Sequence, residues 1–173
     1  MNSSASDSME TAGDSNDRHP DQRWRTMMQD GNAAFRGGDK DAALLLYMEG
    51  MAEADRLFQI AQSNTKPSES DPAPALVVAA FNIANIYAGR ADYAEAKQIM
   101  NRVTTLLRVT IADETAPWQL RSSCLQHVNR ALAYLLDHMR SAGDSDAEIA
   151  EEVSAVQRAA NPRLKLAMVQ HLH

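Results

Sequence analysis

Histidine and cysteine are the residue types of this chain that most often bind metals or act as nucleophiles. The five histidines are His19, His127, His138, His171 and His173. His127 and His138 are eleven positions apart, about three turns of one helix and too far for a single metal ion. His171 and His173 could bind a metal only adventitiously, so we expect no metal site.

Cys124 is the one cysteine, and it precedes His127 by three positions. An i, i+3 pair of this kind could combine a nucleophile with a base. A cysteine packed in the core of an amphipathic helix is the simpler interpretation. A single cysteine also excludes an intramolecular disulfide and is typical of a reducing compartment.

Three carboxylates, Glu148, Glu151 and Glu152, could form an acid pair or a metal site. They stand where a helix is expected to begin, and the helix dipole favours negative charge there, so we interpret them as a solvated face. Phosphate loops, nucleophile elbows and paired-cysteine motifs are missing from the sequence. We expect neither an enzyme nor a bound cofactor.

Composition indicates a helical protein. Hydrophobic residues make up 45% of the 173 residues and aromatics 5%, with 7 glycines and 6 prolines, a balance that favours helices over strands. The net charge of −6 argues against nucleic-acid binding, which needs clustered Lys and Arg. No apolar run is long enough for a membrane span, and the first residues do not read as a secretory signal. We therefore expect a cytoplasmic protein.

Breaks in the apolar periodicity divide the chain into a leader and a helical domain. Residues 1–21 are polar and acidic, with little to bury, which predicts a disordered leader. Residues 22–173 are expected to form antiparallel helix pairs at about 22–63, 73–110 and 116–159. Gly37, Gly38 and Asp39 suit the first chain reversal, and Gly143 the last. Asn161 and Pro162 should end the sixth helix, and a closing helix is expected over 162–172.

Two of these pairs share a set of spacings. In the first pair, successive offsets of twelve, four and three positions join the small or aromatic residues Gly31, Ala43, Tyr47 and Gly50. In the second pair, the same offsets join Ala84, Ala96, Met100 and Val103, and Tyr87 lies between the first two. This pattern resembles the tetratricopeptide repeat, in which small residues allow two helices to cross closely. The resemblance implies an all-α fold, a short right-handed superhelix of about three pairs with a C-terminal capping helix. A generic Ala-rich helical bundle is the alternative.

The repeats depart from the family pattern. Asp30 and Ala34 replace the usual Leu and Tyr of the first pair, and the proline that closes a repeat is missing from both. Gly31 and Ala84 are 53 positions apart, well beyond the roughly 34 of a regular repeat. The third pair keeps little of the signature.

The order of a long second helix, a polar loop and a third helix resembles the three-repeat domain of large immunophilins, over about residues 24–140. Those domains hold acidic C-terminal tails of heat-shock chaperones with two asparagines and several cations. Asn32 and Asn82 match the two asparagines. Met28 stands where a lysine is usual, and Gln126 and Arg130 stand where a basic pair is usual.

Arg25 and Arg36 share a helical face with Asn32 and could add positive charge, although they could equally be solvated arginines. The asparagines could likewise be polar residues with no fixed ligand. The candidate partner-binding residues are Arg25, Met28, Asn32, Phe35, Arg36, Phe81, Asn82, Asn85 and Arg130.

The predicted function is a protein-interaction module or scaffold that holds a peptide or helix in its concave groove. A co-chaperone-like protein that binds acidic C-terminal tails is the narrower variant. The alternative is a homo-oligomeric assembly protein that buries the same apolar surface.

Overall fold

The computed structural model describes residues 21–63 and 70–170, with side chains described up to residue 161. Residues 1–20 of the predicted leader, residues 64–69 of the predicted linker and the last residues of the predicted closing helix lie outside this range, as do His19, His171 and His173. Within the described residues every regular element is a helix, which confirms the all-α prediction. No described helix is both long and apolar enough to cross a membrane.

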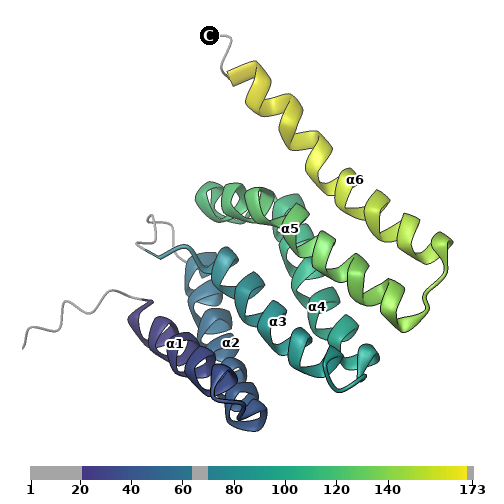
Figure 1. The fold of residues 1–173 in the computed structure, drawn as a ribbon. Coiled ribbons are helices and arrows are strands. Elements are labelled where there is room, and N and C mark those ends of the chain that lie inside the picture. Colours follow the sequence, from purple (N-terminus) through teal and green to yellow (C-terminus); the bar gives the residue numbers. More distant parts are fainter. Residues whose placement is uncertain (1–20, 64–69, 171–173) are drawn as a thin grey trace, which may run out of the picture.

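Within the described residues, six helices follow one another in pairs (Figure 1). Each helix packs against the next in sequence, α3 also packs against α5, and α4 against α6. The helices are α1 Gln22–Arg36, α2 Lys40–Ser63, α3 Pro72–Ala88, α4 Tyr93–Ala112, α5 Trp118–Ala142 and α6 Asp146–Gln170.

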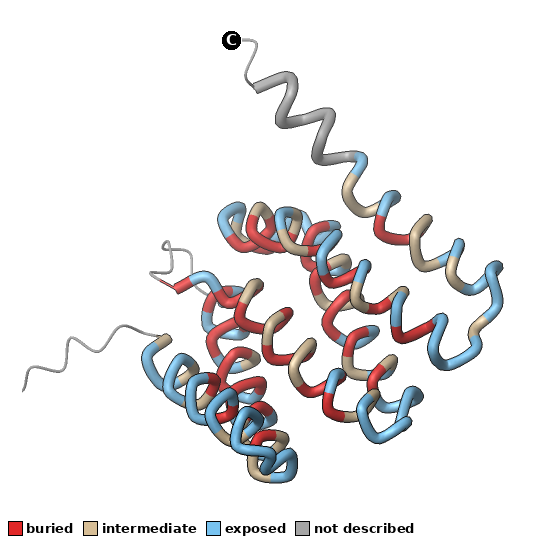
Figure 2. The backbone as a smooth tube through the Cα atoms, viewed as in Figure 1, coloured by how far each residue is buried: buried red, intermediate tan, exposed pale blue. Residues whose placement is uncertain are grey.

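The core follows the pairs as a continuous strip of buried residues along the helices (Figure 2). Burial of such apolar side chains is the main favourable contribution to folding. Helix α3 lies at its centre, since most of its residues are buried. The largest fully buried side chains include Phe58, Leu76, Ile83, Ile86, Met100, Leu107, Ile111 and Leu135.

The same turn joins the two helices of each pair. In each, one residue adopts a left-handed backbone: Gly38 at φ 87°, Ala91 at φ 64° and Gly143 at φ 83°. An aspartate follows each of them, and its N–H donates to the carbonyl five residues earlier. These bonds are Asp39 to Ala34 (3.0 Å), Asp92 to Tyr87 (2.9 Å) and Asp144 to Met139 (3.0 Å). They are the closing bonds of a Schellman motif.

This turn recurs with a nearly constant period. Residue 91 lies 53 positions after residue 38, and residue 143 lies 52 positions after residue 91. The third pair therefore shares the turn geometry of the other two, although it lacks their packing residues.

Close helix crossings explain the small residues of the predicted repeat. A Cβ on Gly31 would lie 2.6 Å from Cε1 of Tyr47, and a Cβ on Gly50 would lie 2.9 Å from Sδ of Met28. Both contacts join α1 to α2. At Gly31 the neighbour is the buried ring of Tyr47, so this crossing requires a glycine there, whereas at Gly50 the flexible side chain of Met28 could shift.

Side-chain caps define the starts of α2 and α3. Asp39 Oδ1 accepts a hydrogen bond from the N–H of Ala42 at 2.9 Å, as an N-cap does. Helix α3 begins at Pro72, earlier than the linker prolines suggested, because the first turn of a helix needs no N–H donors. Asp71 caps it by accepting from the N–H of Ala73.

The predicted helix end at Asn161 and Pro162 is wrong. Helix α6 continues from Asp146 to Gln170, so no separate closing helix begins at residue 162. Proline removes one N–H donor and strains the preceding turn. That cost bends or weakens a helix without always ending it.

Candidate functional site

A pocket of about 230 Å³ lies where the first two helix pairs meet. We call it the asparagine groove, and it is lined by Asn32, Phe35, Tyr47, Asn82 and Asn85. Asn32 and Phe35 are on α1, Tyr47 is on α2, and Asn82 and Asn85 are on α3. Four of the nine residues predicted from the sequence therefore meet in one pocket.

Tyr47 fixes the orientation of one amide in the groove. Its hydroxyl donates a 2.7 Å hydrogen bond to Oδ1 of Asn32, which leaves the NH₂ group of Asn32 as the donor available to a ligand. Tyr47 is 3% exposed. Burial raises the pKa of its hydroxyl, against the opposing charge of Arg36, so the hydroxyl remains a donor at neutral pH.

The carboxamides of Asn82 and Asn85 make no side-chain hydrogen bond within residues 21–63 and 70–161. Each amide therefore offers both a donor and an acceptor. The ring of Phe35 beside them is 44% exposed. The groove thus presents two uncommitted amides together with an apolar surface.

An aromatic stack joins the groove to the third pair. The rings of Phe81 on α3 and Tyr134 on α5 stack with centroids 4.0 Å apart. Nε of Arg130 donates to the hydroxyl of Tyr134 at 2.9 Å, and its guanidinium lies 5.6 Å from the ring centre. Phe81 directly precedes Asn82 on α3, so the stack contacts the helix that carries two of the groove asparagines.

Two of the predicted site residues do not fit the groove. Met28 is 5% exposed and packs between α1 and α2, so its side chain is not available to a partner. Arg25 forms an ion pair with Asp21 at 2.8 Å, one turn earlier on the chain, which neutralises its charge. Arg36 is exposed and forms no ion pair within the part of the chain described here.

Sequence reasoning missed Tyr47 and Tyr134 as residues of the site. The repeat spacing predicts only a packing role for Tyr47, and its burial confirms that role. A buried tyrosine usually places its hydroxyl against a polar partner, and this tendency was the available signal. Nothing in the sequence pattern brings Tyr134 to Phe81, because they lie on different pairs.

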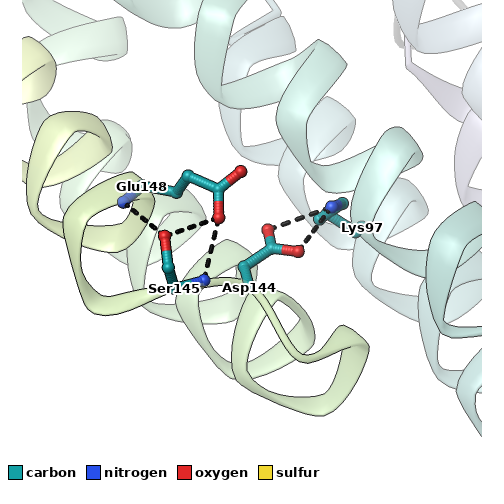
Figure 3. Close-up of polar contacts among 4 residues, drawn as sticks. All are labelled: Lys97, Asp144, Ser145 and Glu148. Atoms are coloured by element: carbon teal, nitrogen blue, oxygen red, sulfur yellow. Dashed lines mark hydrogen bonds and ion pairs between the residues drawn. The ribbon is translucent and has the colours of Figure 1, made fainter.

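A second pocket, of about 290 Å³, lies between α4, α5 and α6 and includes Lys97, Asn101, Glu151 and Glu152. Figure 3 shows the contacts that hold its edge. Nζ of Lys97 reaches both carboxylate oxygens of Asp144, at 2.7 and 3.0 Å. This ion pair ties α4 to the turn before α6.

Ser145 and Glu148 form a capping box at the start of α6 (Figure 3). The N–H and hydroxyl of Ser145 donate to Oε2 of Glu148 at 2.8 and 2.7 Å, and these bonds lower the pKa of Glu148. Glu148 and Glu151 are exposed and Glu152 is half-buried. The predicted solvated helix start therefore describes the first two.

Cys124 is fully buried, as the core interpretation predicted. Burial, with a contribution from the charge of Asp71, raises the pKa of its thiol to about 12. A thiol of this kind carries almost no thiolate at neutral pH and is a poor nucleophile.

The fold and the groove define a protein of paired antiparallel helices with a polar pocket between the first two pairs. A family model described as "Protein of unknown function (DUF2753)" matches residues 22–173. The chain belongs to this family. Neither the curated proteins nor the solved structures include a match.

Proposed function

We propose that this protein is a tetratricopeptide-like interaction module that binds a segment of another protein in the asparagine groove. The observation that carries the proposal is the pair of uncommitted amides, Asn82 and Asn85, beside the exposed ring of Phe35. Asparagine amides can hydrogen-bond the backbone or the terminal carboxylate of a peptide, while an aromatic ring accepts an apolar side chain. An extended peptide or a helix presents both groups.

The packing of the helix pairs supports the tetratricopeptide assignment. The positions that share the twelve, four and three spacing are buried where the helices cross: Gly31, Ala43, Tyr47, Gly50, Ala84, Ala96, Met100 and Val103. The common turn after each leading helix adds a second, independent similarity between the pairs. The recurrence of both features in successive pairs favours a repeat over the alternative, a generic Ala-rich bundle.

Binding of an acidic C-terminal tail, as a co-chaperone would bind it, is the narrower variant. Asn32 and Asn82 line the groove, and the charge of Arg36 acts on Tyr47, which also lines it. The burial of Met28 removes the position where a clamp lysine would stand. We therefore propose peptide binding in general and treat the acidic tail as one ligand to test.

Affinity capture with the full chain tests the proposal. Proteins retained by the wild-type chain and identified by mass spectrometry should be lost with Asn82→Ala and reduced with Arg130→Ala. Asn101→Ala is the matched control, because Asn101 is an exposed asparagine that lines the other pocket. Capture that survives Asn82→Ala as well as it survives Asn101→Ala would contradict a role for the groove.

A homo-oligomeric assembly protein is the second candidate. Leu45 and Met48 on α2 are 65% and 49% exposed, and neighbouring apolar side chains of this kind can form a contact between copies. Light scattering decides between the two candidates. A monomer at high micromolar concentration would reject the oligomer.

A further inference from the structure

The segment that precedes α1 has the opposite charge to the edge of the asparagine groove. Residues 1–20 contain Asp7, Glu10, Asp14 and Asp17 against Arg18, a net charge of −3 with histidine neutral. Between residues 2 and 20, Met9 is the one large apolar residue. This segment therefore offers carboxylates and a single apolar side chain.

The groove offers the complementary groups. Arg36 is exposed, has no ion pair among the described residues and lies close enough to Tyr47 for its charge to affect the hydroxyl. Phe35 presents an exposed ring that suits a methionine side chain.

The length of the segment allows this contact within one molecule. Arg36 lies fifteen residues beyond Asp21, about 22 Å along the axis of α1 at the usual helical rise. Glu10 lies eleven residues before Asp21, so an extended chain can carry it about 36 Å from that residue. Asp14 can reach about 23 Å by the same measure. Both carboxylates can therefore reach Arg36.

We propose that residues 8–14 of this chain occupy the asparagine groove when no partner is bound, with Glu10 and Asp14 at Arg36 and Met9 at Phe35. The proposal rests on the proposed function, because it assigns a regulator to the same groove. A partner must displace the segment, so its apparent affinity is lower than its intrinsic affinity. High salt relieves the competition, since it screens exposed charge pairs.

Paramagnetic broadening in the full chain tests the contact without any partner. A nitroxide is attached through Ser8→Cys; the buried Cys124 stays unlabelled. The observed signals are the side-chain NH₂ groups of Asn32, Asn82 and Asn85, and Asn101 in the other pocket is the internal control. We expect the groove signals to lose intensity and the Asn101 signal to keep it.

Charge variants show whether the contact is the proposed one. With the same label, the double change Glu10→Gln and Asp14→Asn should restore the groove signals, as should Arg36→Gln alone or 1 M salt. Groove signals that match Asn101 from the outset would overturn the proposal. So would equal broadening in the double variant.

Two further outcomes are separable. A mixture of labelled chain without ¹⁵N and ¹⁵N chain without label detects contact between molecules. Broadening in that mixture would overturn the intramolecular contact in favour of a second copy. No partner is present in the broadening measurements, so a negative result there does not contradict partner binding in the groove. Loss of the captured partner tests the proposed function separately and does not change the result of the broadening measurements.

Discussion

Ala91 provides a test of the recurring turn. It is the one non-glycine residue in the described part of the chain with a positive φ, 64°. A left-handed backbone costs an L-residue roughly 1–2 kcal/mol. Glycine removes this cost but gives up roughly 0.4–1 kcal/mol through the greater entropy of the unfolded chain. We therefore expect Ala91→Gly to raise the free energy of unfolding by about 0.5–1 kcal/mol.

The reverse changes should have the opposite sign. A Cβ on Gly38 or Gly143 would meet nothing within 4 Å, so Gly38→Ala and Gly143→Ala impose backbone strain with no collision. Each should lower the free energy of unfolding by about 0.5–1 kcal/mol.

Urea denaturation followed by circular dichroism measures these free energies, and thermal melting should show shifts of a few degrees, since about 1 kcal/mol moves Tm by roughly 2–4 °C at this chain length. Ala52→Gly is the matched control. Ala52 is exposed within α2, and glycine there should destabilise by about 1 kcal/mol. A loss of stability in Ala91→Gly similar to that in Ala52→Gly would refute the assignment of a left-handed turn at residue 91.

Three further predictions concern the crossing, the cap and the core. Gly31→Ala should destabilise by about 1–3 kcal/mol, because its Cβ would lie 2.6 Å from the ring of Tyr47; unchanged urea denaturation would refute this contact. Ser145→Ala should cost about 1 kcal/mol at neutral pH. The pKa of Glu148 is lowered in the folded state, so its charged form stabilises the fold above its unfolded pKa, and this stabilisation is lost as the pH falls through the folded pKa. The difference in free energy of unfolding between Ser145→Ala and wild type should therefore become smaller in acid. A difference that grows in urea titrations at falling pH would contradict the capping interaction. The thiol of Cys124 should react with a disulfide reagent at pH 8 only as fast as the chain unfolds, because it is buried and its pKa is raised to about 12. Rapid reaction of the native protein would show that the thiol is accessible.

The helices could be predicted from local signals. Asp39 as a cap and Gly143 as a terminator act through their own backbone neighbourhood, so the sequence alone places those boundaries. The helix end predicted at Pro162 is wrong because the free-energy cost of proline is only one contribution to the stability of α6. The local sequence gives that cost and does not give the favourable contributions of the rest of the helix.

The site was less predictable because it depends on which helix covers which face. The helical face of Asn32 was correct, but the same rule placed Met28 on it, and α2 covers Met28. The small residue Gly50 makes room for that side chain, and it comes from another helix. The ring stack of Phe81 and Tyr134 likewise depends on the packing of α3 against α5. The left-handed turn at Ala91 has no local signal, since alanine rarely adopts it; only the period of 53 and 52 residues indicates it.

The affinity of a captured partner for the double variant Asn82→Ala and Asn85→Ala tests the groove most directly. Two hydrogen bonds of about 0.5–1.5 kcal/mol each correspond to a loss of roughly fivefold to a hundredfold or more in affinity. Titration calorimetry with purified partner should show this loss, with Asn101→Ala close to wild type. Equal affinities for the wild type and the double variant would contradict the proposal that the asparagine groove binds the partner.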